Sequence, residues 1–255
     1  MAEGRITRGT TGTNRLRRVD RWIARLPPLR RTDDPLVVDL GFGARPATSL
    51  ELHERLARVR PAVQVIGLEI DPERVRAAAA SARPGLSFRR GGFEIPVERA
   101  PVVIRAFNVL RQYREHEVAA AWDRMTARLQ PAGVLVEGTC DELGRVCSWV
   151  ALTAEGPCSL TVSLRLAGLQ TPAIVAERLP KALIHRNVPG ERVHEFVEAL
   201  DAHWRRNAAL AVYSPAQRWI ALARGLRAEG WPVRDGVARW RLGELTVDWA
   251  AVAPR

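Results

Sequence analysis

Residues 36–46 read LVVDLGFGARP, and this stretch decides the fold. Its first five residues form a short apolar run, typical of a strand that is buried on both faces of a parallel sheet. The glycines at 41 and 43 then turn the chain and lack the Cβ atoms that would keep a ligand away from the backbone. A helix that begins near Thr48, with Glu51 completing a capping box, would present free N–H groups at the same place. The stretch therefore predicts a strand, a ligand-binding turn and a helix, in that order.

Further strands and helices alternate on either side of this stretch up to residue 145. Apolar runs predict strands at 63–68, 86–88, 102–104 and 134–136. Apolar periodicity and capping residues predict helices at 14–26, 48–59, 71–82 and 118–129. Such alternation is typical of parallel βαβ units, which form an open sheet covered by helices on both faces.

Beyond residue 145 the pattern changes. Two apolar runs, 149–152 and 160–164, flank a turn at 155–157 and predict an antiparallel hairpin. Helices at roughly 190–210 and 215–229 and a strand-like tail follow. We therefore expect an α/β fold with a Rossmann-like, mostly parallel sheet flanked by helices, and a C-terminal extension of hairpin and helices.

The second strand ends in a carboxylate, within GLEID at residues 67–71. Ligands of open parallel sheets bind outside the carboxyl ends of the strands, beside the first strand. Glu69 would stand there, and its carboxylate can accept both hydroxyl hydrogens of a ribose. A glycine turn followed by an acidic strand end therefore predicts a nucleotide cofactor.

Two cofactors suit such a site, and the residues around the turn favour one of them. A nicotinamide dinucleotide requires a third glycine where this chain has Pro46, and its pyrophosphate gains little from the acid at Asp39. S-adenosylmethionine carries an ammonium and a sulfonium, which a nearby acid attracts. The charges therefore favour the methyl donor, with a nicotinamide-dependent oxidoreductase as an alternative.

Residues 36–138 resemble the class I S-adenosylmethionine-dependent methyltransferases motif by motif. The matching segments are 37–43, 67–71, 89–94 (RRGGFE), 105–110 (RAFNVL) and 129–135 (LQPAGVL). The resemblance implies S-adenosyl-L-methionine as the cofactor and methyl transfer as the activity. The residues that it places at the cofactor are Asp39, Gly41, Gly43, Arg45, Glu69, Phe93, Glu94 and Asn108.

The chain departs from the family pattern at three places. Arg45 replaces the last glycine of the first motif, where it would bring a cation near the carboxylate of the donor. Phe93 stands between the glycine and Glu94 in the adenine motif. No helix is evident after the fifth strand, so the end of the sheet is expected to be rearranged. One domain is expected over 1–255, with 30–145 as the cofactor-binding core and 146–255 as sheet completion and acceptor-side cover.

Methyl transfer needs a general base only when the acceptor must lose a proton. Three candidates are His116, Glu137 and His185. His185 belongs to segment 181–190, KALIHRNVPG, which could recognise an anion or a planar amide as a lid or acceptor site. The alternatives are a cap or surface histidine at 116, an ion pair with an arginine at 137, and a helix end whose basic residues complement the dipole in segment 181–190.

The positive net charge bears on which molecules the protein binds. The formal net charge is +11, and Lys181 is the only lysine. Arg15, Arg17, Arg18, Arg21 and Arg25 share one helix face, which would be either a solvated face or an RNA contact. The acceptor is therefore predicted to be a small molecule, with RNA methylation as one alternative and a non-catalytic S-adenosylmethionine-binding module as another.

Three cysteines without a Cys-x-x-Cys pair indicate free thiols, no zinc site and no other metal. The chain has no apolar run of about 18 residues, the length that a membrane span needs, and no secretory signal pattern. The sequence therefore predicts a cytoplasmic protein without a membrane partner.

Overall fold

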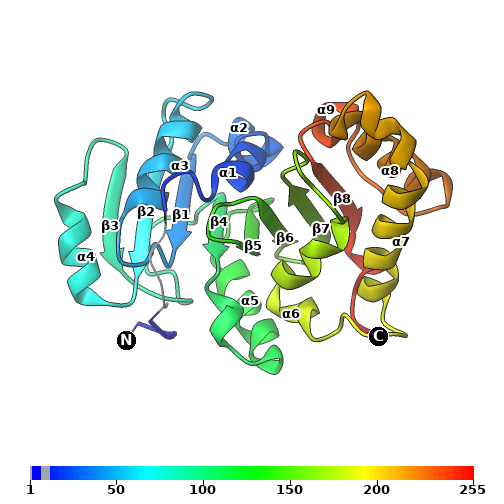
Figure 1. Ribbon diagram of the computed structural model, residues 1–255. Coiled ribbons are helices and arrows are strands. Elements are labelled where there is room, and N and C mark those ends of the chain that lie inside the picture. The colour runs from blue at the N-terminus through cyan, green and yellow to red at the C-terminus, as the bar shows by residue number, and fades with distance from the viewer. Residues whose placement is uncertain (1, 7–11) are drawn as a thin grey trace.

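The computed structural model describes residues 2–6 and 12–255. Its centre is an eight-stranded sheet in the order β3-β2-β1-β4-β5-β6-β7-β8, with helices on both faces (Figure 1). Strands β1 to β5 are parallel, and β6, β7 and β8 are antiparallel to their neighbours. The predicted Rossmann-like α/β fold is confirmed.

The parallel half contains the five predicted strands and the helices between them. The strands are β1 Leu36–Leu40, β2 Gln64–Glu69, β3 Leu86–Arg90, β4 Val103–Phe107 and β5 Val134–Cys140. The connecting helices are α3 Ala47–Ala57, α4 Pro72–Ala79 and α5 Val118–Thr126, with short 3-10 turns η1 Leu110–Gln112 and η2 Glu115–Glu117 before α5. Two helices precede the sheet, α1 Arg17–Ile23 and α2 Pro27–Arg31.

The antiparallel half is built from β6 Val146–Thr153, β7 Gly156–Leu164 and β8 Glu244–Asp248. Its helical elements are η3 Pro172–Arg178, α6 Lys181–Ile184, α7 Arg192–Arg206, η4 Ala208–Val212, α8 Pro215–Ala228, α9 Val237–Trp240 and η5 Trp249–Ala251. The predicted hairpin and both long C-terminal helices are present.

Strand β5 passes directly into β6, which explains why no helix was evident after the fifth strand. The five intervening residues, 141–145, are too few for a parallel crossover, which needs a dozen or more, but enough for a hairpin. Gly144 sits in this turn with φ +63°, and a Cβ there would lie 1.9 Å from the carbonyl oxygen of Arg15. A glycine is therefore required where the N-terminal segment crosses the turn.

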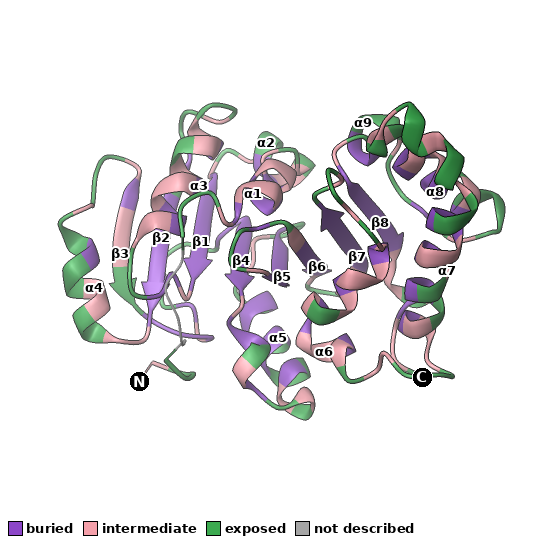
Figure 2. Cartoon of the chain, viewed as in Figure 1, coloured by how far each residue is buried: buried purple, intermediate pink, exposed green. Residues whose placement is uncertain are grey.

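Apolar side chains form a core on each face of the sheet, and the inner strands β1, β4 and β5 are buried throughout, whereas the edge strand β3 is partly exposed (Figure 2). One core packs α5, η3, α7 and α8 against strands from both halves. The other packs α1, α2 and α3 against the parallel strands and β6. One continuous sheet and a shared core thus join residues 30–145 to residues 146–255.

One local prediction in the parallel half is wrong. Thr48 and Glu51 do not form a capping box, because α3 begins at Ala47 with Pro46 as its N-cap. The Thr48 hydroxyl donates to Asp39 instead, at 3.1 Å, and Glu51 accepts from the backbone of Asn14 at 2.7 Å. Tertiary partners therefore replaced the local cap.

Candidate nucleotide site at the carboxyl ends of the strands

The glycine turn lies at the carboxyl end of β1, as the sequence predicted. Gly41 and Gly43 both have left-handed backbones, with φ +75° and +81°, which other residues adopt only with strain. The Gly41 N–H donates to the Leu68 carbonyl of β2 at 2.7 Å. The turn is therefore held against the end of the neighbouring strand.

Glu69 lies next to this turn, at the end of β2, and is buried. Its Oε2 accepts the Gly43 N–H at 2.9 Å, and its Oε1 accepts the Ile70 N–H at 2.9 Å. An Arg74 guanidinium nitrogen lies 3.6 Å from Oε2. An ionised carboxylate offers about four acceptor positions. With the Asp71 N–H, which donates to Oε1 at 3.5 Å, three backbone bonds fix Glu69 and leave an acceptor position for a ligand hydroxyl.

A second wall of the site comes from the segment after β3. Glu94 Oε1 accepts the Gly92 N–H at 3.0 Å, which turns the carboxylate back toward the glycines. The buried Phe93 ring packs against Tyr113, with ring centroids 5.3 Å apart. The pocket between this wall and β1–β2 is lined by Leu40, Gly41, Glu69, Ile70, Gly91, Gly92, Phe93, Val109 and Tyr113, together with residues 3–5.

Sequence reasoning missed part of this lining. Leu40, Ile70 and Val109 looked like ordinary core residues, because apolar pocket walls and apolar cores share one pattern. Residues 3–5 lie in a polar segment that showed no periodicity, so their place in the pocket gave no signal.

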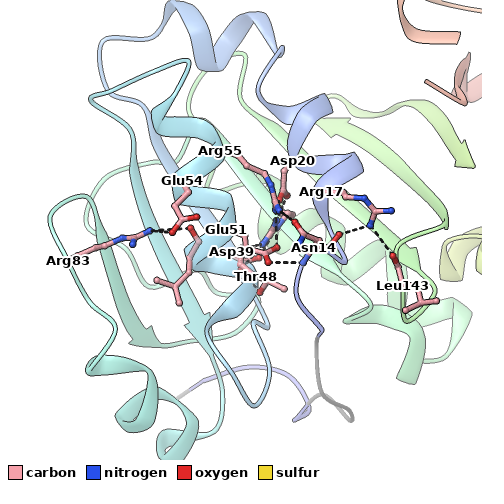
Figure 3. A network of polar contacts seen from close by, with 12 residues as sticks. Asn14, Arg17, Asp20, Asp39, Thr48, Glu51, Glu54, Arg55, Arg83 and Leu143 are labelled. Atoms are coloured by element: carbon pink, nitrogen blue, oxygen red, sulfur yellow. Dashed lines mark hydrogen bonds and ion pairs between the residues drawn. The ribbon is translucent and has the colours of Figure 1, made fainter. Parts of the chain in front are cut away.

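Asp39 does not point into the pocket. Its carboxylate accepts from Arg105 of β4, with Nε at 2.9 Å from Oδ1, and from the Ser49 hydroxyl at 2.7 Å. The same guanidinium binds Asp20 of α1, which Arg55 also contacts at 2.5 Å. Figure 3 shows Asp20, Arg55, Asp39 and Thr48 of this network close together. The negative charge of Asp39 is therefore compensated inside the fold, and a cofactor ammonium cannot be selected by it.

Arg45 and Asn108 flank the site. Arg45 is exposed in the turn before α3. Asn108 follows β4 with a left-handed backbone, φ +60°, and its Oδ1 accepts the Cys140 N–H of β5 at 3.1 Å. Strained backbone of this kind concentrates at functional sites. Asn108 thus joins β4 to β5 beside the pocket.

The three candidate bases do not gather in one place. His116 is exposed in η2, and His185 is exposed after α6, with its Nε2 2.9 Å from Lys181 Nζ. Their segments meet through Arg186, whose Nε lies 2.6 Å from Glu115. Glu137 lies inside the core, where burial raises its pKa to about 8 and the Trp122 indole acts in the opposite direction. At neutral pH its carboxyl is therefore protonated.

Three arginines gather near Asn108 at the carboxyl edge of β4 and β5. Arg15 donates to the Cys140 and Asp141 carbonyls, and Arg111 donates to the Glu177 carbonyl at 3.3 Å. The backbone of Arg178 is held in place because its carbonyl accepts hydrogen bonds from the Thr139 and Ser148 hydroxyls. Burial and the charges of Arg178 and Arg15 lower the pKa of Arg111. The carboxylate nearest Arg178 is the exposed Glu142, at 3.5 Å.

The arginines of the N-terminal helix bind the protein itself. Arg15 contacts the β5 end as described, and Arg17 donates to the Leu143 carbonyl at 3.0 Å. Arg18 donates to the Gly144 and Leu242 carbonyls, and Arg21 lies 2.5 Å from Glu244. These guanidiniums anchor the segment to the β5–β6 turn and to β8, while Arg25, the fifth arginine of the predicted face, is exposed.

Neither a metal cluster nor a membrane span stands out in the part of the chain that the structure describes. Residues 2–6 and 12–255 contain no group of three or more histidine, cysteine, aspartate and glutamate side chains that could hold a metal ion. In the same residues no helix has the length and apolar character to cross a membrane.

Comparisons with known proteins find similarity in structure alone. No family model matches the chain, and no curated protein matches it. Human N-acetylserotonin methyltransferase in complex with S-adenosylmethionine is 21% identical with a TM-score of 0.37, covering 47% of this chain and 33% of that one. An amino pentose methyltransferase from Micromonospora echinaspora, with bound S-adenosylmethionine, is 22% identical with a TM-score of 0.37, covering 58% and 63%. Magnesium protoporphyrin IX methyltransferase from Synechocystis PCC 6803, with bound S-adenosylhomocysteine, is 18% identical with a TM-score of 0.37, covering 48% and 53%. The chain thus spans between a third and two thirds of these structures.

Proposed function

We propose that this protein is an enzyme that transfers a methyl group from S-adenosylmethionine to a small-molecule acceptor. The observation that carries the proposal is one pocket with two kinds of polar group. Glu69 offers a fixed carboxylate at the end of β2, and the Phe93 N–H and the Glu94 carboxylate, after β3, both bind the pocket-lining residue Glu3. A nucleoside presents ribose hydroxyls, which suit the first group.

The second group suits the adenine edge. Adenine carries its N6 amine, a donor, beside the acceptor N1. Glu94 would accept from the amine, and the Phe93 N–H would donate to N1. When bound, the cofactor would supply a methyl group on a positively charged sulfur. The chain would supply binding and orientation, which contribute a large part of the rate of such displacements.

Titration calorimetry with S-adenosylhomocysteine tests the cofactor. We expect binding by the wild type and a loss of about 10- to 100-fold in Glu69→Gln, since each charge-assisted hydrogen bond is worth about 1.5–3 kcal/mol. Glu98→Gln is the matched control, because Glu98 is an exposed carboxylate outside the pocket that pairs with Arg89 at 3.5 Å.

NADH serves as the competing ligand in the same titration. Pro46, which stands where a dinucleotide site has its third glycine, predicts no binding of NADH. Binding of NADH in place of S-adenosylhomocysteine would contradict the proposal. So would the absence of S-adenosylhomocysteine binding in both the full chain and a variant lacking residues 2–6.

The acceptor side favours an anion. Arg15, Arg111 and Arg178 gather beside Asn108, and the closest carboxylate to Arg178 is one exposed glutamate. Grouped guanidiniums recognise carboxylates and phosphates. We therefore propose a small acceptor that bears a carboxylate or a phosphate.

Transfer of a radiolabelled methyl group to a panel of small acids and their amide counterparts tests this acceptor class. We expect transfer to acids over amides and a rise in KM of about tenfold or more in Arg178→Met, from the loss of one charged hydrogen bond. Arg76→Met is the control, because Arg76 is exposed on α4. Transfer confined to amides or to RNA would contradict an anionic small acceptor.

A further inference from the structure

The chain's own N-terminal segment lies in the nucleotide pocket. Residues 3–5 line it from the solvent side, close to the carboxyl ends of β1 and β2, and Figure 1 shows this end of the chain below those strands. The Glu3 N–H donates to Glu94 Oε2 at 2.8 Å. The Glu3 carbonyl accepts the Phe93 N–H at 2.9 Å.

These two bonds use the groups assigned above to adenine. The backbone of one residue, Glu3, with its N–H on the Glu94 carboxylate and its carbonyl on the Phe93 N–H, thus satisfies the same acceptor and donor as the N6 and N1 atoms of the base would. We propose that residues 3–5 are a built-in competitor of the nucleotide and keep the site closed until they are displaced. This inference rests on the proposed function.

Residues 3–5 fill the pocket so closely that a nucleotide cannot occupy it at the same time. A Cβ on Gly92 would lie 1.9 Å from the Glu3 carbonyl oxygen, so the two backbones are in direct contact. A Cβ on Gly4 would lie 2.8 Å from Ile70 Cδ1 and 3.1 Å from the Tyr113 hydroxyl. The cavity that remains measures about 20 Å³, room for about one water molecule. A nucleobase can therefore enter only after the segment leaves.

The contacts that hold the segment are suited to release. The Arg5 N–H donates to the Tyr113 hydroxyl, and the Arg5 guanidinium lies 4.7 Å from the centre of that ring and 2.9 Å from Glu117. Glu3 pairs with Arg124. Both ion pairs are substantially exposed, with Arg5 at 52% and Arg124 at 58%, and exposed pairs contribute little to stability. The closed state is therefore specific in its hydrogen bonds but reversible.

Calorimetry on four proteins tests the inference: the full chain, a variant lacking residues 2–6, Arg5→Ala, and Arg76→Ala as the control. If the segment is closed in nine molecules of ten, its removal should tighten S-adenosylhomocysteine binding about tenfold, because affinity scales with the open fraction. Arg5→Ala, which keeps the length of the chain, should give part of this gain. Arg76→Ala should leave the affinity unchanged.

A capped peptide of residues 2–6, AEGRI, separates the two hypotheses. We expect it to bind the shortened variant and to compete with S-adenosylhomocysteine. If the peptide binds and S-adenosylhomocysteine does not, the pocket is a site for residues 3–5, and the proposed cofactor is contradicted. Equal or weaker S-adenosylhomocysteine binding after removal of the segment, with no competition by the peptide, would overturn the inference, because the segment would then have no effect on nucleotide binding or would support it.

Discussion

A single buried residue, Glu137, makes the stability of the whole fold depend on pH. Its carboxyl is fully buried beneath α5, where the Trp122 indole N–H only partly offsets the effect of burial. Burial disfavours the charged form and raises the pKa from an ordinary value of 4.5 to about 8. The unfolded chain therefore releases this proton several pH units below the folded protein.

The sign of the effect on stability follows from that difference. Between pH 4.5 and about 8 the folded state holds the proton and the unfolded state does not, so stability falls as pH rises. The slope is about 1.4 kcal/mol per pH unit for one group. This slope is absent below pH 4.5 and again above the pKa that Glu137 has in the folded protein.

Glu137→Gln should remove this slope, because an amide of nearly the same shape has no proton to lose. Urea unfolding at pH 5, 7 and 8.5 would measure it, with Glu98→Gln as a surface control. We expect the wild type to lose stability relative to Glu137→Gln as pH rises. Parallel profiles for the two proteins would show that Glu137 does not titrate in this range.

At the scale of elements, Arg105 connects α1 to two strands. From β4 it binds Asp39 on β1 and Asp20 on α1, and all three side chains are buried. Burial raises the pKa of Asp20, while Arg105 and Arg55 act against that rise. The guanidinium is thus what keeps two carboxylates in the interior.

Arg105→Met should destabilise the fold by about 3–5 kcal/mol, because the buried Asp39 would lose its charged partner and Asp20 would keep only Arg55. Arg99→Met is a matched control, since Arg99 pairs with Asp34 at 2.5 Å with half of its side chain exposed, and should cost less than about 1 kcal/mol. Urea denaturation at pH 7 gives both values. Equal losses in the two variants would mean that the buried pair contributes no more than a surface one.

At the scale of the whole molecule, the sequence predicted the order and type of the elements well. The five parallel strands, the β6–β7 hairpin and helices α7 and α8 all lie within a few residues of their predicted places, because buried strands and amphipathic helices leave clear periodicities. The glycine turn and Glu69 were also found where parallel topology places a ligand.

What the sequence could not show were contacts between distant segments. Asp39 looked available to a ligand because Arg105, its charged partner in the fold, lies 66 positions away. The arginine face of α1 looked solvated because its carbonyl partners belong to the β5–β6 turn and the segment before β8. Residues 3–5 gave no pattern at all, because their pocket contacts are made mainly by the backbone.

The Arg105 cluster also has a consequence for the history of this sequence. Losing Arg105 alone leaves the Asp39 carboxylate in the interior without a charged partner, whereas exchanging all three for apolar side chains removes the difficulty. Single steps away from the present combination are therefore disfavoured, although a distant combination would be viable. We therefore expect Asp20, Asp39 and Arg105, although spread over 86 residues, to be conserved together or replaced together among related sequences.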